Sequence, residues 1–137
     1  MPDLWPADFG KASDVPPIVV LREQADLLSK KTTGEILGEV TTGTSGQDIN
    51  HWFYLVVPRL DNYRYHLLTV KHSVGLYPAE ILSIPSNTRF TSTKESQFIE
   101  HLRDILNNPD TKRVVASLVQ QAKASGEPPP GAQVGVS

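Results

Sequence analysis

Two aromatic, β-branched runs, joined by a short connection that contains Pro58, lie between His51 and His72. The first run extends from Trp52 to Val57, and the second from Tyr63 to His72. Two such runs separated by a few residues are typical of a β-hairpin. Along both runs the side chains alternate between the two faces of a strand. This alternation predicts an antiparallel sheet with one face on a core and the other meeting water or a partner. This feature restricts the chain to folds that are built around an antiparallel sheet.

Further strand signals lie on both sides of the hairpin. Residues 35–42 predict a strand, and a connection rich in turn-forming residues follows over residues 43–48. A fourth strand is predicted over residues 76–82, where Pro78 favours an edge position because proline cannot donate to the ladder. Residues 89–91 predict a short fifth strand. The first hairpin run is apolar on both faces, which predicts a central position in the sheet.

Helical periodicity flanks the strands. Pro16 and Pro17 predict the first turn of a helix, whose apolar stripe is Ile18, Leu21, Ala25 and Leu28. Residues 92–95 match a capping box for a second helix, and residues 107–110 separate it from a third. The order of elements predicts an α+β fold with an N-terminal helix, a four- to five-stranded antiparallel sheet and two C-terminal helices packed on one face. This order resembles that of several small secretion-chaperone and immunity-type folds, and order alone assigns no function.

The 137 residues predict one domain with two extensions. We expect a flexible N-terminal arm over residues 1–15, a single α+β domain over residues 16–124, and a disordered Pro/Gly-rich tail over residues 125–137. Trp5 and Phe9 in the arm are costly to leave in water, so we expect at least one of them to pack on the domain or on a partner.

Composition excludes several classes of function. The chain has no cysteine, which rules out thiolate catalysis, cysteine-ligated zinc and disulfides. No run approaches the roughly 20 apolar residues that a membrane helix needs. The N-terminal residues lack the basic and apolar regions of a secretory signal, which predicts a cytoplasmic protein. The net charge of −2 gives no electrostatic reason to expect nucleic acid as a partner.

Motifs for catalysis and metal binding are incomplete. The connection Gly43–Asp48 lacks the Gly-Lys-Ser/Thr ending of a phosphate loop, and Ser45 lacks the Gly-x-Ser-x-Gly frame of a nucleophile elbow. His66 and His72 share a predicted strand face, but six extended residues separate them by about 20 Å. We therefore predict no catalytic, cofactor-binding or metal-binding residue. Two alternatives stay open: a hydrolase-like enzyme with a cleft near Gly43–Asp48, using Ser45, Asp48 and a histidine, and a weak nucleic-acid-binding domain.

The leading hypothesis is a small non-enzymatic accessory or interaction protein, which binds a protein partner or forms a homodimer through an aromatic sheet face. Tyr, Trp and Arg are enriched at protein interfaces because they bury a large area while keeping a polar tip. On one alternation of the two runs, the tyrosines and the tryptophan share a face. The candidate partner-binding residues are Trp52, Tyr54, Tyr63, Tyr65, Arg64 and His66. The competing interpretation is that these side chains complete the core.

Overall fold

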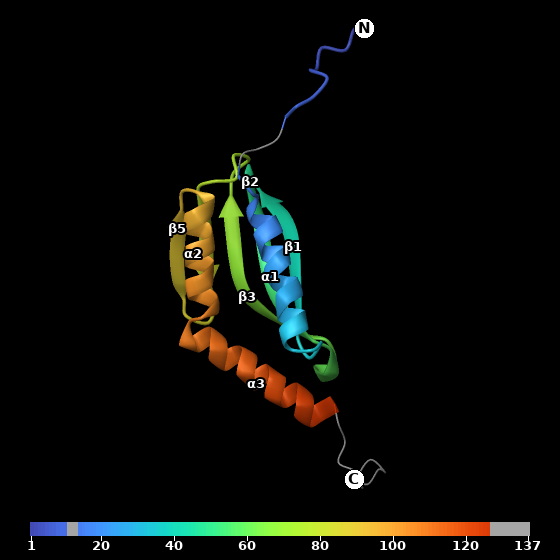
Figure 1. The fold of residues 1–137 in the computed structure, drawn as a ribbon, viewed down its shortest axis with the longest axis vertical. Coiled ribbons are helices and arrows are strands. Elements are labelled where there is room, and N and C mark those ends of the chain that lie inside the picture. Colours follow the sequence, from blue (N-terminus) through green and yellow to red (C-terminus); the bar gives the residue numbers. More distant parts are fainter. Residues whose placement is uncertain (11–13, 127–137) are drawn as a thin grey trace.

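The computed structural model describes residues 1–10 and 14–126 (Figure 1). Helix α1 comes first, five strands follow, and two helices end the described part. Their bounds are α1 (Pro17–Lys31), β1 (Leu37–Ser45), β2 (Asp48–Val57), β3 (Tyr63–His72), β4 (Ala79–Ser83), β5 (Thr88–Ser92), α2 (Glu95–Leu106) and α3 (Pro109–Gly126), with a 3-10 turn η1 (Pro58–Leu60) between β2 and β3. The predicted α+β fold is confirmed. Helix α3 continues two residues into the predicted tail, and the rest of that tail lies outside the described residues.

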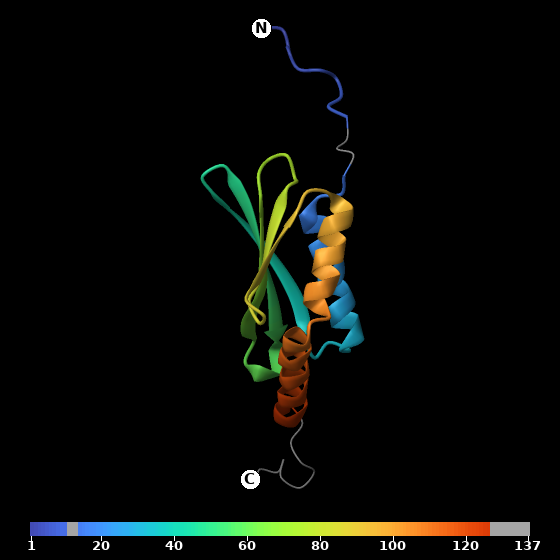
Figure 2. The same ribbon diagram turned by 90° about the vertical axis from the view of Figure 1, so that its left-hand side faces the viewer.

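The five strands form one antiparallel sheet in the order β1-β2-β3-β4-β5. All three helices lie on one side of this sheet, and no helix of the described residues covers its other side (Figure 2). β2 lies inside the sheet, as its two apolar faces predict. The predicted edge position of the fourth strand is wrong, because β4 lies between β3 and β5. Pro78 stands immediately before β4, where its missing N–H removes no bond from the ladder.

An extra residue in β3 changes which side chains face the helices. Phe53 pairs with Leu68 and Tyr54 pairs with His66, so Leu67 has no partner of its own in β2. This is a β-bulge, in which two residues of one strand oppose one residue of the other. Leu67 and Leu68 are both buried in the core. The strict alternation predicted for this strand is therefore wrong. Alternation places Tyr63 and Tyr65 on the opposite side of the sheet from Leu68, whereas the structure places all three on the same side.

The core lies between the sheet and the helices. Its largest buried side chains include Leu21 of α1, Phe53 and Leu55 of β2, Leu68 of β3 and Phe98 of α2. Helix α1 lies very close to β1, because a Cβ atom on Gly38 would stand 2.5 Å from the Cα atom of Ala25. Glycine at this position allows the helix to approach the strand.

The predicted capping box at the start of α2 is not formed. Helix α2 begins at Glu95 with Lys94 at its N-cap, and the Lys94 side chain makes no capping hydrogen bond to the helix. Gln97 instead accepts a hydrogen bond from the Thr93 N–H at 2.7 Å, while the Glu95 carboxylate accepts one from the Val15 N–H at 2.9 Å. The Glu95 side chain therefore binds Val15, two residues before α1, and does not cap its own helix.

The described part of the N-terminal arm extends away from the body (Figure 1). Trp5 and Phe9 are 73% and 74% exposed, and their ring centroids are 5.8 Å apart. The aromatic rings therefore pack on each other and not on the domain, so the expectation that one of them packs on the domain or on a partner is not met by the domain. Among the described residues, no helix has the length and apolar character that crossing a membrane requires.

Candidate binding face of the sheet

The uncovered side of the sheet, here called the outer face, carries a cluster of large side chains on β1, β2 and β3. Register places them side by side, since Leu37 pairs with Val56, Val56 with Arg64, and Tyr54 with His66. Leu37 is 40% exposed although it is aliphatic. We call this cluster the outer patch, and its members are Leu37, Trp52, Tyr54, Val56, Arg64 and His66.

Charge and aromatic contacts order the centre of the outer patch. The Arg64 guanidinium carbon lies 4.1 Å from the centroid of the Tyr54 ring, within the range of a cation–π contact. The same guanidinium donates through Nε to a carboxylate oxygen of Glu39 at 2.9 Å and donates a second bond to that oxygen through Nη2. Arg64 is thus held between an aromatic ring and an acid from two neighbouring strands.

Two further contacts fix the aromatic members. The His66 ring lies 5.4 Å from the Tyr54 ring, and its Nε2 atom lies 2.7 Å from the Thr69 hydroxyl. The Trp52 indole lies across Gly43, where an added Cβ atom would stand 2.9 Å from the indole carbons. The side chains of the outer patch are therefore already ordered. This lowers the conformational entropy that these side chains would lose when a partner binds.

The structure brings together four of the six predicted partner-binding residues, namely Trp52, Tyr54, Arg64 and His66. Tyr63 and Tyr65 lie on the inner, helix-covered side, because they pair with the buried residues Val57 and Leu55. Burial raises the pKa of the Tyr65 hydroxyl, and the neighbouring Tyr63 adds to that effect. The prediction that Tyr63 and Tyr65 share a face with Trp52 is wrong because of the bulge at Leu67.

The predicted partner-binding residues omit three contributors to this face. Leu37, Glu39 and Val56 alternate with inward residues and face outward beside the aromatic members. Alternation along β1 and β2 carried the signal for Leu37 and Val56. The ion pair between Glu39 and Arg64 depends on strand pairing, which the sequence did not reveal.

A pair of buried histidines on the inner side was also missed. His51 and His72 are 3% and 4% exposed, and their Nε2 atoms lie 2.9 Å apart. The Ser73 carbonyl can only accept, so His72 donates to it from Nδ1 at 2.6 Å, and the Nε2 atom of neutral His72 accepts. His51 therefore donates from Nε2 to His72, and its Nδ1 atom accepts from the Thr42 hydroxyl at 2.9 Å.

This network stabilises the neutral form of His51. Burial lowers the pKa of His51 to about 4, with smaller contributions from electrostatic interactions with His72 and Arg22. All four ring nitrogens of His51 and His72 have hydrogen-bond partners, so neither ring presents a free nitrogen to a metal ion. Within residues 1–10 and 14–126, no group of three or more His, Asp or Glu side chains is arranged to hold a metal.

The geometry that the hydrolase alternative requires is absent from the described part of the chain. None of the histidine hydrogen bonds there involves Ser45 or Asp48. Asp48 and His72 line one hollow of about 240 Å³, but both ring nitrogens of His72 already have partners. General base catalysis needs a base within hydrogen-bond reach of the group it activates.

A second serine–histidine contact joins β5 to α2. The Ser92 hydroxyl lies 2.9 Å from Nδ1 of His101, and the His101 ring stacks on Phe90 at 4.7 Å. Ser92 is completely buried, so no substrate can reach its hydroxyl. This contact fastens the helix to the strand.

No family model matches this chain, and neither a curated protein nor a solved structure matches it. The function is therefore argued from the geometry of the outer patch.

Proposed function

We propose that this is a small, non-enzymatic interaction protein whose outer patch binds a second copy of the chain. The observation that carries the proposal is that none of the described helices covers the outer face, although Trp52, Tyr54 and Val56 lie there. Large apolar and aromatic side chains that gather on an uncovered face are typical of interaction surfaces.

The charges on this face favour a second copy as the partner. Arg64 pairs with Glu39, and Arg89 pairs with Glu80 at 3.2 Å on β4 and β5. Because these cations are already matched by acids of the same face, two copies can meet without strong like-charge repulsion. A twofold dimer places the same patch on both subunits, which suits a face without excess charge.

Light scattering coupled to size-exclusion chromatography, at two protein concentrations, tests this proposal. The unmodified chain is expected to elute as a dimer. Val56→Lys is expected to give a monomer, because the substitution brings a positive charge without an acidic partner into the middle of the contact. Thermal unfolding followed by circular dichroism checks that the variant is folded.

The matched control is Thr91→Lys, which adds the same charge on the outer face but at the exposed edge strand β5. This variant is expected to remain a dimer. A monomeric unmodified chain would contradict self-association. An unmodified dimer that Val56→Lys leaves intact would place the interface elsewhere.

A further inference from the structure

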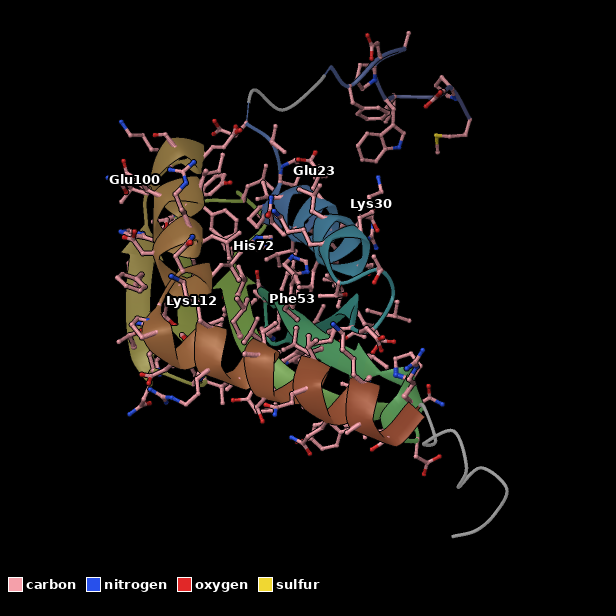
Figure 3. The ribbon with its side chains drawn as sticks, turned by 60° about the horizontal axis from the view of Figure 1, so that its bottom comes forward. Glu23, Lys30, Phe53, His72, Glu100 and Lys112 are labelled. Atoms are coloured by element: carbon pink, nitrogen blue, oxygen red, sulfur yellow. The ribbon has the colours of Figure 1, made fainter. Side chains whose placement is uncertain are left out.

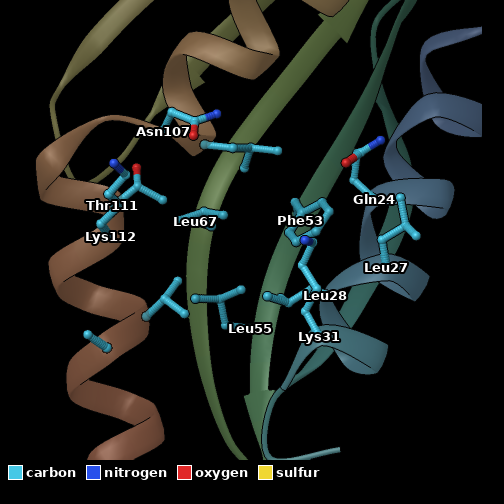
Figure 4. Close-up of a pocket in the computed structure, with 13 residues that line it drawn as sticks. Gln24, Leu27, Leu28, Lys31, Phe53, Leu55, Leu67, Asn107, Thr111 and Lys112 are labelled. Carbon is cyan, nitrogen blue, oxygen red and sulfur yellow. The ribbon is translucent and has the colours of Figure 1, made fainter. Parts of the chain in front are cut away.

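A hollow opens between α1 and α3 on the inner side of the sheet (Figure 4). Its volume is about 590 Å³, within the range of pockets that bind ligands. Phe53 lines this hollow, and Figure 3 shows this residue between the two helices. Most of its lining is apolar, and the residues that line it are Gln24, Leu27, Leu28, Lys31, Phe53, Leu55, Leu67, Leu106, Asn107, Thr111, Lys112, Val115 and Ala116.

A second hollow continues the first one along α1 and α2. It has a volume of about 250 Å³ and shares Gln24, Leu106 and Asn107 with the larger hollow. At its other end it reaches Val20, near the start of α1. Because the two hollows share lining residues, we call them together the furrow, which extends along α1 from Val20 to Lys31 at its end.

The furrow is lined by cations and by no acid. Arg103, Lys31 and Lys112 line it, and neither hollow has an Asp or Glu in its lining. None of these three cations forms a salt bridge among the described residues. The Thr111 hydroxyl is buried beside the larger hollow and has no hydrogen-bond partner among those residues. A matching occupant would be apolar, carry negative charge and offer a polar group to Thr111.

The N-terminal arm of this chain has that chemistry. Leu4, Trp5 and Phe9 are 85%, 73% and 74% exposed, so the arm presents a large apolar area to water. Asp3 and Asp8 stand beside these side chains. The arm and the furrow thus complement each other in both apolar surface and charge.

The arm is anchored near the Val20 end of the furrow. Val15 is held at this point, because its N–H donates to Glu95 at 2.9 Å and its carbonyl accepts from the Tyr77 hydroxyl at 3.0 Å. The chain from Phe9 to Val15 spans about 20 Å when extended, and the helix from Pro17 to Leu28 is about 17 Å long. Phe9 can therefore reach the larger hollow from its own anchor point.

We propose that residues 3–9, which extend away from the body in the described conformation, fold back and bind the furrow of the same chain, with Trp5 and Phe9 in the hollows and the aspartates near the lysines. The furrow lies on the opposite side of the sheet from the outer patch. The proposal is therefore independent of the proposed self-association.

Paramagnetic labelling tests this proposal in the full chain. Because the chain has no cysteine, Ala7→Cys gives a single site for a nitroxide label in the arm. In NMR spectra we expect the backbone amide signals of Gln24, Leu106 and Lys112 to lose most of their intensity. The intensity should return when ascorbate reduces the label.

Charge reversal supplies the matched comparison. Lys31→Glu with Lys112→Glu is expected to weaken this signal loss several-fold. Lys30→Glu with Lys123→Glu makes the same charge change on the same two helices at positions outside the furrow lining, and it should leave the loss unchanged. Equal loss in both double variants, or loss confined to amides outside the furrow, would overturn the proposal.

A mixed sample distinguishes an arm in its own furrow from an exchanged arm. Spin-labelled chain without isotope is mixed with unlabelled chain enriched in ¹⁵N, so only contacts between copies can broaden the observed signals. No specific loss at the furrow amides is expected in this sample. Loss of the same size as in the single-chain experiment would overturn the assignment to the same chain.

Discussion

Protonation of the His51 ring makes the stability of the folded protein depend on pH. Its pKa is about 4 in the folded protein, against an ordinary value of 6.5, chiefly because the ring is buried. The unfolded chain therefore binds a proton more readily than the folded protein does. The stability that the neutral ring supports is complete above pH 6.5 and decreases as the pH falls toward 4, in total by about 3 kcal/mol.

The corresponding measurement compares the unmodified chain with His51→Gln by urea unfolding across this pH range. The unmodified chain is expected to be the more stable one near neutral pH, and the difference should shrink by about 3 kcal/mol as the pH approaches 4. NMR titration of the His51 ring provides the direct check. A ring that gains its proton near its ordinary pKa would contradict the effect of burial.

At the scale of elements, the sequence predicted the type and order of the helices and strands, but not the orientation of β3. Alternating side chains predict a strand because every second side chain faces the core. A bulge cannot be recognised from this pattern when the extra residue is as apolar as its neighbour, and Leu67 is followed by the equally apolar Leu68. Trp52 and Tyr54 were assigned correctly to one face because β2 alternates without interruption.

The orientation of β3 leads to different expected effects for two tyrosines. Tyr65 packs against the core from the inner side, so Tyr65→Ser is expected to lower the free energy of unfolding by about 2 kcal/mol. The oligomeric state should not change. Tyr54→Ser on the outer face should have the reverse pattern, with weaker self-association and little change in stability.

Urea unfolding and light scattering on both variants make this comparison. The bulge is contradicted if Tyr65→Ser weakens association while the free energy of unfolding stays the same. Alternation alone would have predicted that result, because it places both tyrosines on one face.

On the scale of the whole molecule, the sheet separates two surfaces that use different parts of the chain. The outer patch comes from β1, β2 and β3, whereas the furrow lies between helices on the inner side. The sequence contained the components of both surfaces, but the furrow depends on how α1, α2 and α3 are spaced over the sheet. Residue pattern alone does not determine that spacing, because it follows from packing such as the approach of Ala25 to Gly38.

Separation by the sheet predicts that substitutions on the two surfaces act independently. Residues that share no partner and lie well apart usually have additive effects, within about 0.5 kcal/mol. Val56→Lys is therefore expected to abolish dimerisation while leaving the loss of amide signals in the furrow unchanged. Lys31→Glu with Lys112→Glu should release the arm and leave the dimer intact. If either set of substitutions altered both readouts in proteins that unfold normally, the arm would have to contribute to the dimer contact, and the two surfaces would form one interface.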